Sequence, residues 1–238
     1  MHSQHNALFT PHRTRRQTGF SLIEVVLAIG IFLVTVLALV GLLGPTLQSV
    51  DEVEKTDEVA SVVNTVNAFL QNSPEIANAD ESKFETIFNA VAGDGYATIF
   101  VFRKYASANS DDVSLKIGFF GETSATVDNS DITTGSTVLA AGPIYRVVLT
   151  PSSVTPDTYL SSTVRDSDTG VYSLQSANID NYLEGYFAME VRIYVENASP
   201  TFDGAKLPAN PGETAEDASL SALNDKQPLF TYNTAIVR

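Results

Sequence analysis

One continuous apolar segment constrains this chain more than any other feature. Val25–Leu43 runs for nineteen residues, and Thr35 is its only polar side chain. A helix rises about 1.5 Å per residue, so a helix over this run nearly matches a hydrocarbon core of about 30 Å. The sequence therefore predicts one membrane-spanning helix that contacts the lipid bilayer.

The charges on the two sides of this run predict its orientation. The first nineteen residues hold Arg13, Arg15 and Arg16 and no acidic residue, whereas the 238-residue chain has 28 Asp+Glu against 14 Lys+Arg. Because basic residues stay on the cytoplasmic side of a membrane helix, we expect a cytoplasmic N-terminus and an external C-terminal bulk. The net charge of −14 also excludes a generic nucleic-acid partner, which needs a basic surface.

Three interpretations of this N-terminal segment compete. A cleavable secretory signal peptide has a shorter apolar region, of roughly 7–15 residues, and a small-residue cleavage site that Gly44-Pro45-Thr46 matches poorly. A plain signal anchor explains length and orientation, with Glu24 merely snorkelling to the membrane surface. A carboxylate beside an apolar run is costly at membrane depth, however, so Glu24 should have a partner. The third interpretation comes from a resemblance.

The residues around Glu24 carry that resemblance. Gly19-Phe20-Ser21-Leu22-Ile23-Glu24 follows a basic leader and precedes the apolar run. In this order the elements resemble the processing site of type IV pilins and type II secretion pseudopilins. The resemblance covers the leader, the cleavage site and the whole apolar span.

The resemblance implies a role for three residues. Gly19 would end a leader peptide, 1–19, that a prepilin peptidase removes, and Phe20 would become an N-methylated mature N-terminus. Glu24 would pair with the N-terminal amine of a neighbouring pilin or pseudopilin subunit. Pairing the new ammonium with a carboxylate in the same apolar layer relieves two burial costs. Phe20 and Glu24 are one helical turn apart, so a pair within the chain also stays open.

The resemblance also implies a location and a class of function. The precursor would be a single-pass protein of the bacterial inner membrane with a periplasmic C-terminal domain. An inner-membrane assembly platform would then place it in a periplasmic or surface filament, either type IV pilus-like or a type II secretion pseudopilus. The stretch 24–32 and the large cysteine-free C-terminal region favour a minor pseudopilin. The alternative is a membrane-anchored extracytoplasmic binding or enzymatic domain that does not polymerise.

The N-terminal helix is expected to continue beyond the membrane and to change character. Apolar residues between Thr46 and Leu70 mostly recur every three or four positions, which is typical of an amphipathic helix. Gly41, Gly44 and Pro45 mark a point where this helix should bend. The predicted parts are a leader (1–19), a transmembrane half (20–44), an amphipathic half (45–71) and an extracytoplasmic globular domain (72–238).

An acidic cluster in the middle of this helix has two interpretations. It is either a solvated face or a surface that meets basic residues of adjacent subunits. Its residues are Asp51, Glu52, Glu54, Lys55, Asp57 and Glu58.

The remainder of the chain predicts an α+β fold, with the long N-terminal helix packed on a mainly antiparallel β-sheet. A helix is expected over 82–92, with a capping box at Ser82–Glu85 and Gly93 as its stop. Alternation over 187–196 predicts a half-buried strand. Polar stretches at 121–137 and 197–228 predict loops, the second an exposed functional loop or a partly ordered excursion. Further strands are expected at 98–105, 113–120, 144–150 and 229–237.

The chemistry-bearing side chains argue against an enzyme. Cysteine is absent, and the three histidines, His2, His5 and His12, all lie in the leader. A mature chain without them cannot build a Ser-His-Asp triad, a Cys-His pair or the usual zinc sites. We therefore expect no catalytic activity and no organic cofactor.

One metal hypothesis remains, which is calcium. Asp166 and Asp168 lie in the turn Asp166-Ser167-Asp168-Thr169-Gly170, and 128–131 is a weaker version of it. Hard oxygen ligands of this kind suit Ca²⁺. Such turns are also common without a metal.

Overall fold

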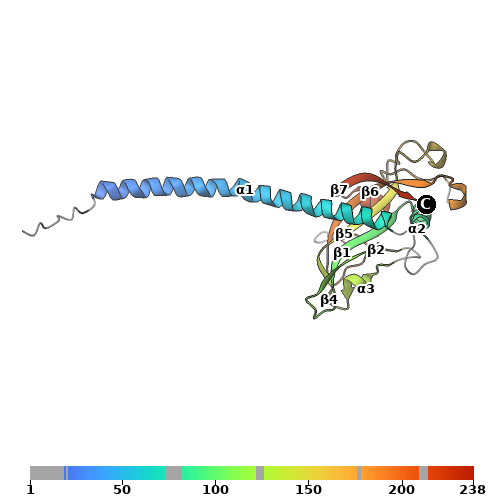
Figure 1. Ribbon diagram of the computed structural model, residues 1–238, viewed down its shortest axis with the longest axis horizontal. Helices are drawn as coiled ribbons and strands as arrows, with labels where there is room; N and C mark the ends of the chain where they lie inside the picture. Colours follow the sequence, from blue (N-terminus) through green and yellow to red (C-terminus); the bar gives the residue numbers. More distant parts are fainter. Residues whose placement is uncertain (1–18, 20, 73–81, 122–125, 176–177, 209–213) are drawn as a thin grey trace, which may run out of the picture. The chain divides into compact units, whose positions relative to one another are not determined.

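The computed structural model describes residues 19, 21–72, 82–121, 126–175, 178–208 and 214–238, with the backbone alone for 43–55. Helix α1 spans Leu22–Gln71 (Figure 1), which confirms the predicted long helix. Pro45 lies within α1, and the bend expected there stays a prediction. The chain divides into two compact units, Met1–Lys55 and Thr56–Arg238, and α1 contributes to both.

Five strands form the sheet of the second unit, as far as the chain is described. Its order is β2-β1-β5-β6-β7, and every neighbouring pair is antiparallel (Figure 1). This confirms the α+β class and the strands expected from the sequence. Their bounds are β1 (Ala97–Tyr105), β2 (Val113–Phe119), β5 (Ala140–Pro151), β6 (Tyr186–Asn197) and β7 (Phe230–Val237).

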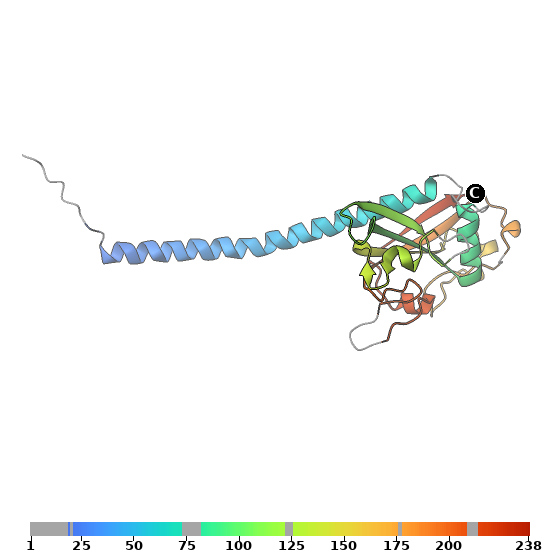
Figure 2. The same ribbon diagram turned by 90° about the horizontal axis from the view of Figure 1, so that it is seen from below.

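Two helices cover one face of this sheet, here called the inner face. They are the C-terminal part of α1 and helix α2 (Lys83–Asp94) (Figure 2). Val62, Val66 and Leu70 of α1 are buried at the spacing that the sequence predicts. They share one core with Phe84, Ile87 and Phe88 of α2 and with Ile99, Val147, Phe187 and Val191 of the sheet.

The start of α2 is as predicted, but its end is not. Ser82 accepts a hydrogen bond from the Glu85 amide, and the Glu85 carboxylate accepts one from the Ser82 amide, so the capping box is confirmed. The helix continues past Gly93 to Asp94, and Gly95 forms the left-handed C-cap at φ 85°. Gly93 keeps helical geometry because a glycine stops a helix only where the backbone turns left-handed.

The opposite, outer face of the sheet is covered as well. Short segments lie on it (Figure 2), so the expectation of a half-buried strand over 187–196 is wrong. Glu190 and Glu196 are 5% and 4% exposed, whereas Val195 is 51% exposed. The polar side chains of this strand do alternate with apolar ones, but Glu190 and Glu196 bind arginines instead of facing water. These segments are α3 (Asn129–Ile132), β3 (Thr133–Thr134), β4 (Thr137–Val138) and α4 (Leu220–Asn224). The single turns Asp157–Tyr159 and Ile179–Asn181 instead belong to the inner side, where Tyr159 and Ile179 pack against the core.

The stretch 197–228 belongs to this cover. Its residues 209–213 lie outside the described part of the chain, and α4 forms near its end. Leu207 and Leu223 are 4% and 1% exposed and pack on Val148 and Tyr194 of the sheet. The expectation of an exposed loop is therefore wrong for these residues, because they bury apolar side chains against the outer face.

Candidate functional site

The predicted processing region lies at the start of α1. Gly19 is exposed, and among the described residues none lies within 4 Å of where its side chain would begin. Phe20, the predicted methylation site, lies outside the described residues, as do the arginines of the leader. The cleavage predicted after Gly19 and the methylation of Phe20 therefore stay predictions.

Glu24 occupies the first turn of α1. Its Oε2 accepts a hydrogen bond of 3.1 Å from the Ser21 amide, and the Ser21 carbonyl accepts one from Val25. A carboxylate here satisfies one of the unpaired amides of the helix start and interacts favourably with the helix dipole. The structure thus gives Glu24 a partner within its own chain, while the pair with an N-terminal amine stays a prediction.

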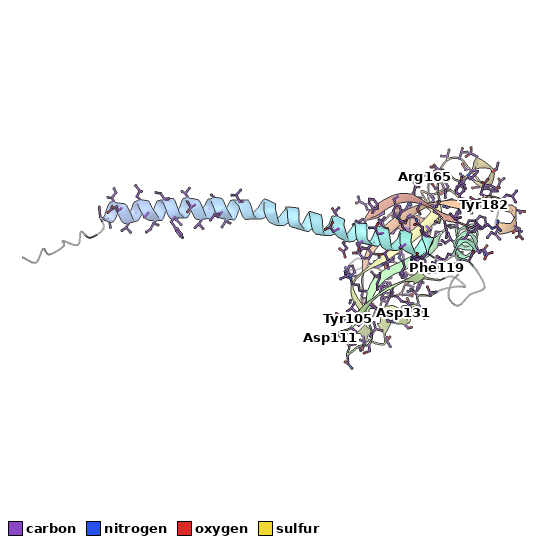
Figure 3. All side chains as sticks on the ribbon, in the orientation of Figure 1. Tyr105, Asp111, Phe119, Asp131, Arg165 and Tyr182 are labelled. Carbon is purple, nitrogen blue, oxygen red and sulfur yellow. The ribbon has the colours of Figure 1, made fainter. Side chains whose placement is uncertain are left out.

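The segment after Glu24 presents an apolar surface on all sides. Every residue from Leu22 to Leu42 is exposed, and Figure 3 shows their side chains projecting around the helix. Thr35 donates a 2.7 Å hydrogen bond to the Phe32 carbonyl, so its hydroxyl is satisfied inside the helix. This helix is long enough and apolar enough to cross a membrane.

The C-terminal part of α1 is joined to the sheet by polar as well as apolar contacts. The Asn67 side-chain oxygen accepts hydrogen bonds from Tyr232 and Thr234 of β7, at 3.3 Å and 3.4 Å. Burial raises the pKa of Tyr232 to about 12. Burial also raises the pKa of Tyr145, and a hydrogen bond to Glu58 adds to this effect.

That contact bears on the acidic cluster of α1. Glu58 interacts with Tyr145 of its own chain, so this member is not simply solvated. The side chains of 51–55 lie outside what the structure describes. The hypothesis that this cluster meets adjacent subunits therefore stays open.

Lys83 caps the C-terminal end of α1 with its side chain. Its ammonium donates hydrogen bonds of 2.5 Å and 2.8 Å to the carbonyls of Phe69 and Asn72 and lies 4.2 Å from the centre of the Phe69 ring. The last carbonyls of a helix have no partner within it and carry partial negative charge, so a buried cation there is stabilising. Sequence analysis missed this role, because Lys83 resembles any exposed first-turn residue.

The first calcium candidate is a hydrogen-bonded turn. One carboxylate oxygen of Asp166 accepts from the Asp168 amide, the Thr169 amide and the Thr169 hydroxyl, at 2.8–3.0 Å. These bonds, first those from Thr169, hold the pKa of Asp166 below its usual value. The turn thus has a structural explanation that needs no metal, and calcium stays a prediction.

The same turn is docked on the outer face of the sheet by arginines. The Gly170 carbonyl accepts hydrogen bonds from Arg165 and Arg192, at 2.9 Å and 2.7 Å. Both arginines also bind the buried carboxylate of Glu190. Figure 3 labels Arg165 on the segment that covers this part of the sheet. Two cations beside the turn disfavour a further cation electrostatically.

The second calcium candidate, 128–131, begins α3. Asp128 caps this helix by accepting from the Ser130 and Asp131 amides. Asp131, labelled in Figure 3, bonds Lys104 at 2.6 Å and lies 3.5 Å from Lys116. Within the described residues, no group of three or more His, Cys, Asp or Glu side chains could hold a metal ion.

A buried ion pair is the other feature that sequence analysis missed. Arg146 is 1% exposed and donates to both carboxylate oxygens of Glu196, at 2.5 Å and 3.2 Å. It also donates to the carbonyls of Gly204 and Lys206, at 2.8 Å and 2.9 Å. The sequence did hold one signal, since β5 and β6 are largely apolar but contain Arg146 and Glu196. A charged side chain on a strand that is covered on both faces needs a partner.

Comparison with known proteins assigns one segment of the chain to a known family of motifs. Residues 14–40 match the family described as the prokaryotic N-terminal methylation motif. This is the signal motif of type IV pilins and pseudopilins, so the resemblance seen in the sequence is confirmed. No curated protein and no solved structure matches the chain.

The N-terminal segment therefore defines a class. It is a pilin-type signal on an apolar helix that fits membrane anchoring, followed by an α+β globular unit. More closely, the motif supports a precursor of the pilin or pseudopilin type, which implies processing by a prepilin peptidase and pilin-like subunit partners.

Proposed function

We propose that this chain is a structural subunit that is cleaved after Gly19 and assembled into a type IV pilus-like or type II secretion pseudopilus filament. One observation carries the proposal. The methylation motif, 14–40, coincides with a helix whose surface from Leu22 to Leu42 is apolar and exposed on all sides. Such a surface is stable only in lipid or against other apolar helices. A filament of parallel helices supplies the second environment.

The start of α1 supports a specific assembly contact. The bond from the Ser21 amide holds one oxygen of the Glu24 carboxylate at the first turn, at the edge of the apolar surface. Cleavage after Gly19 would create an ammonium on Phe20 at the same depth. In our proposal Glu24 keeps the Ser21 bond and pairs its charge with the Phe20 amine of a neighbouring subunit, because neither charge is stable alone in an apolar layer.

The proposal includes location and role. The precursor lies in the inner membrane with its N-terminus in the cytoplasm and its globular unit in the periplasm, and an inner-membrane platform transfers it to the filament. We favour a minor pseudopilin with no enzymatic activity. The ionic clusters around Arg146, Glu190 and Asp131 support the expected lack of enzymatic activity, because each of these side chains is paired within the globular unit.

N-terminal sequencing of the mature protein tests the proposal. We expect a start at methylated Phe20; a start at Met1 would favour the alternative, a membrane-anchored domain that does not polymerise. Glu24→Ala should be processed and inserted but poorly incorporated into filaments, whereas Asp157→Ala, an exposed control outside the acidic cluster, should be incorporated normally. Normal incorporation of Glu24→Ala would refute the role given to this residue.

A further inference from the structure

The two edges of the sheet differ in how they are protected. At the β2 edge, the amides of Thr126 and Val127 donate to the Phe119 carbonyl and cover one end of the strand. At the other end, Val113–Ile117, no described strand pairs with the free edge of β2. β7 is the last strand at the opposite edge, and it contains no charged residue and no proline across Phe230–Val237. The unpaired amides and carbonyls of such an edge strand can bind a further strand. Lysine, proline or a bulge normally prevents this, and β7 has no lysine or proline.

Both edges run in the same direction. Each neighbouring pair in the order β2-β1-β5-β6-β7 is antiparallel, so β2, β5 and β7 are parallel to one another. Two copies of the globular unit in the same orientation would therefore bring β7 of one copy beside β2 of the next as a parallel pair. An antiparallel pair of two β7 strands would instead relate the two copies by a two-fold axis and close as a dimer.

The exposed side chains of the two edges also match. Val113 and Leu115 lie four and two residues before Ile117, which packs against the core, so all three project from the inner face. Phe230 lies opposite the buried Ile193 and projects from the same face. Leu115 and Phe230 are 57% and 43% exposed in the single chain. Edge pairing would place these apolar side chains side by side on one continuous inner face.

We propose that β7 of one copy of this chain pairs in parallel with the Val113–Ile117 end of β2 of a second copy. The contact is heterologous, so it can repeat along an assembly instead of closing as a dimer. Charge does not oppose it at the strands, since β7 is uncharged and the β2 edge carries only Lys116. A contact of this length is weak in free solution, and it rests on the proposed filament to hold copies at high local concentration.

The absence of cysteine makes the proposal directly testable. Ser114 on β2 and Thr231 and Ala235 on β7 are exposed, and by strand alternation and register all three project from the outer face. Full-length chains carrying Ser114→Cys with either Thr231→Cys or Ala235→Cys would be oxidised in membranes and in isolated filaments. Non-reducing gels should show a ladder of dimers, trimers and longer products for at least one pair. Ser114→Cys combined with Asn89→Cys, an exposed position on α2, which contacts the central strands β1 and β5, is the matched control.

The outcomes separate this proposal from the filament itself. A ladder confined to the β2–β7 pairs supports edge pairing, and single-cysteine variants should remain monomeric. Products no stronger than those of the control would overturn it. Strong dimers from Thr231→Cys or Ala235→Cys alone would also overturn it, because they report β7–β7 contact. Filaments that form normally without a ladder refute only the edge contact, whereas an uncleaved chain that forms no filament refutes the proposed function.

Discussion

Removing the buried guanidinium of Arg146 should strongly destabilise the globular unit. Arg146 holds both carboxylate oxygens of Glu196 and two carbonyls of the covering segment, Gly204 and Lys206. It also lies 4.8 Å from the centre of the Phe100 ring. Arg146→Met keeps much of the apolar stem but leaves a 3% exposed carboxylate without its cation.

The expected loss of unfolding free energy is about 3–5 kcal/mol, the usual cost of breaking one side of a buried ion pair. Part of this loss comes from the two carbonyls, since each buried polar group left without a partner costs about 1–3 kcal/mol. The segment that carries Gly204 and Lys206 can relax toward water, so the costs do not simply add. Because domains are stabilised by about 5–15 kcal/mol, this loss is a large fraction of the total.

Urea unfolding of the full-length chain in detergent, followed by far-UV circular dichroism, measures this loss. The double variant Arg146→Met/Glu196→Met should recover the part of the loss that comes from the unpaired Glu196 carboxylate, because removing both charges also removes their desolvation cost, whereas the Gly204 and Lys206 carbonyls still lack their donor. Arg103→Met, an exposed arginine on β1, should change stability by less than about 1 kcal/mol. If Arg146→Met costs no more than this control, or the double variant is no more stable than the single one, the ion pair does not hold the cover.

Three further predictions concern helix ends and pH. Lys83→Met should lower stability by about 1–3 kcal/mol in urea unfolding, because the carbonyls of Phe69 and Asn72 at the end of α1 lose their charged donor. Gly95→Ala should destabilise by about 1–2 kcal/mol, since φ is +85° and the new methyl would lie 2.9 Å from Leu220, whereas Gly93→Ala should be neutral or stabilising; equal effects would contradict the C-cap at Gly95. Burial acts to raise the pKa of Glu190, but its arginine partners hold that pKa below the usual value. The folded-state pKa is therefore lower than the unfolded one, so this stability is present above roughly pH 4.3 and is lost as pH falls through the folded pKa. Glu190→Gln should flatten the acid side of a stability–pH curve; an unchanged curve would contradict the assignment.

Local patterns in the sequence were enough to predict most elements. The capping box at Ser82, the spacing of Val62, Val66 and Leu70, and the alternation in β6 each depend on residues within a few positions of one another. Such signals survive without knowledge of the rest of the chain. The end of α2 was misplaced because Gly93 and Gly95 are equivalent locally, and only the folded backbone, left-handed at Gly95, distinguishes them.

The sequence did not predict which charged residues pair over long distances in the chain. Arg146 and Glu196 are 50 positions apart, and Arg165 and Glu190 are 25 apart. Nothing in either neighbourhood indicates which cation meets which carboxylate. A strand with alternating charge is consistent both with a solvated face and with a covered one.

The sequence by itself determined the N-terminal signal, the apolar helix and the α+β class, since each follows from contiguous residues whose order is the signal. Only the tertiary structure decided what becomes of the polar face of the sheet. Burying charges there is favourable only when partners from distant segments meet them at hydrogen-bonding distance, as Gly204 and Gly170 do for Arg146 and Arg192. That condition depends on how the chain folds back on itself, and no local pattern encodes it.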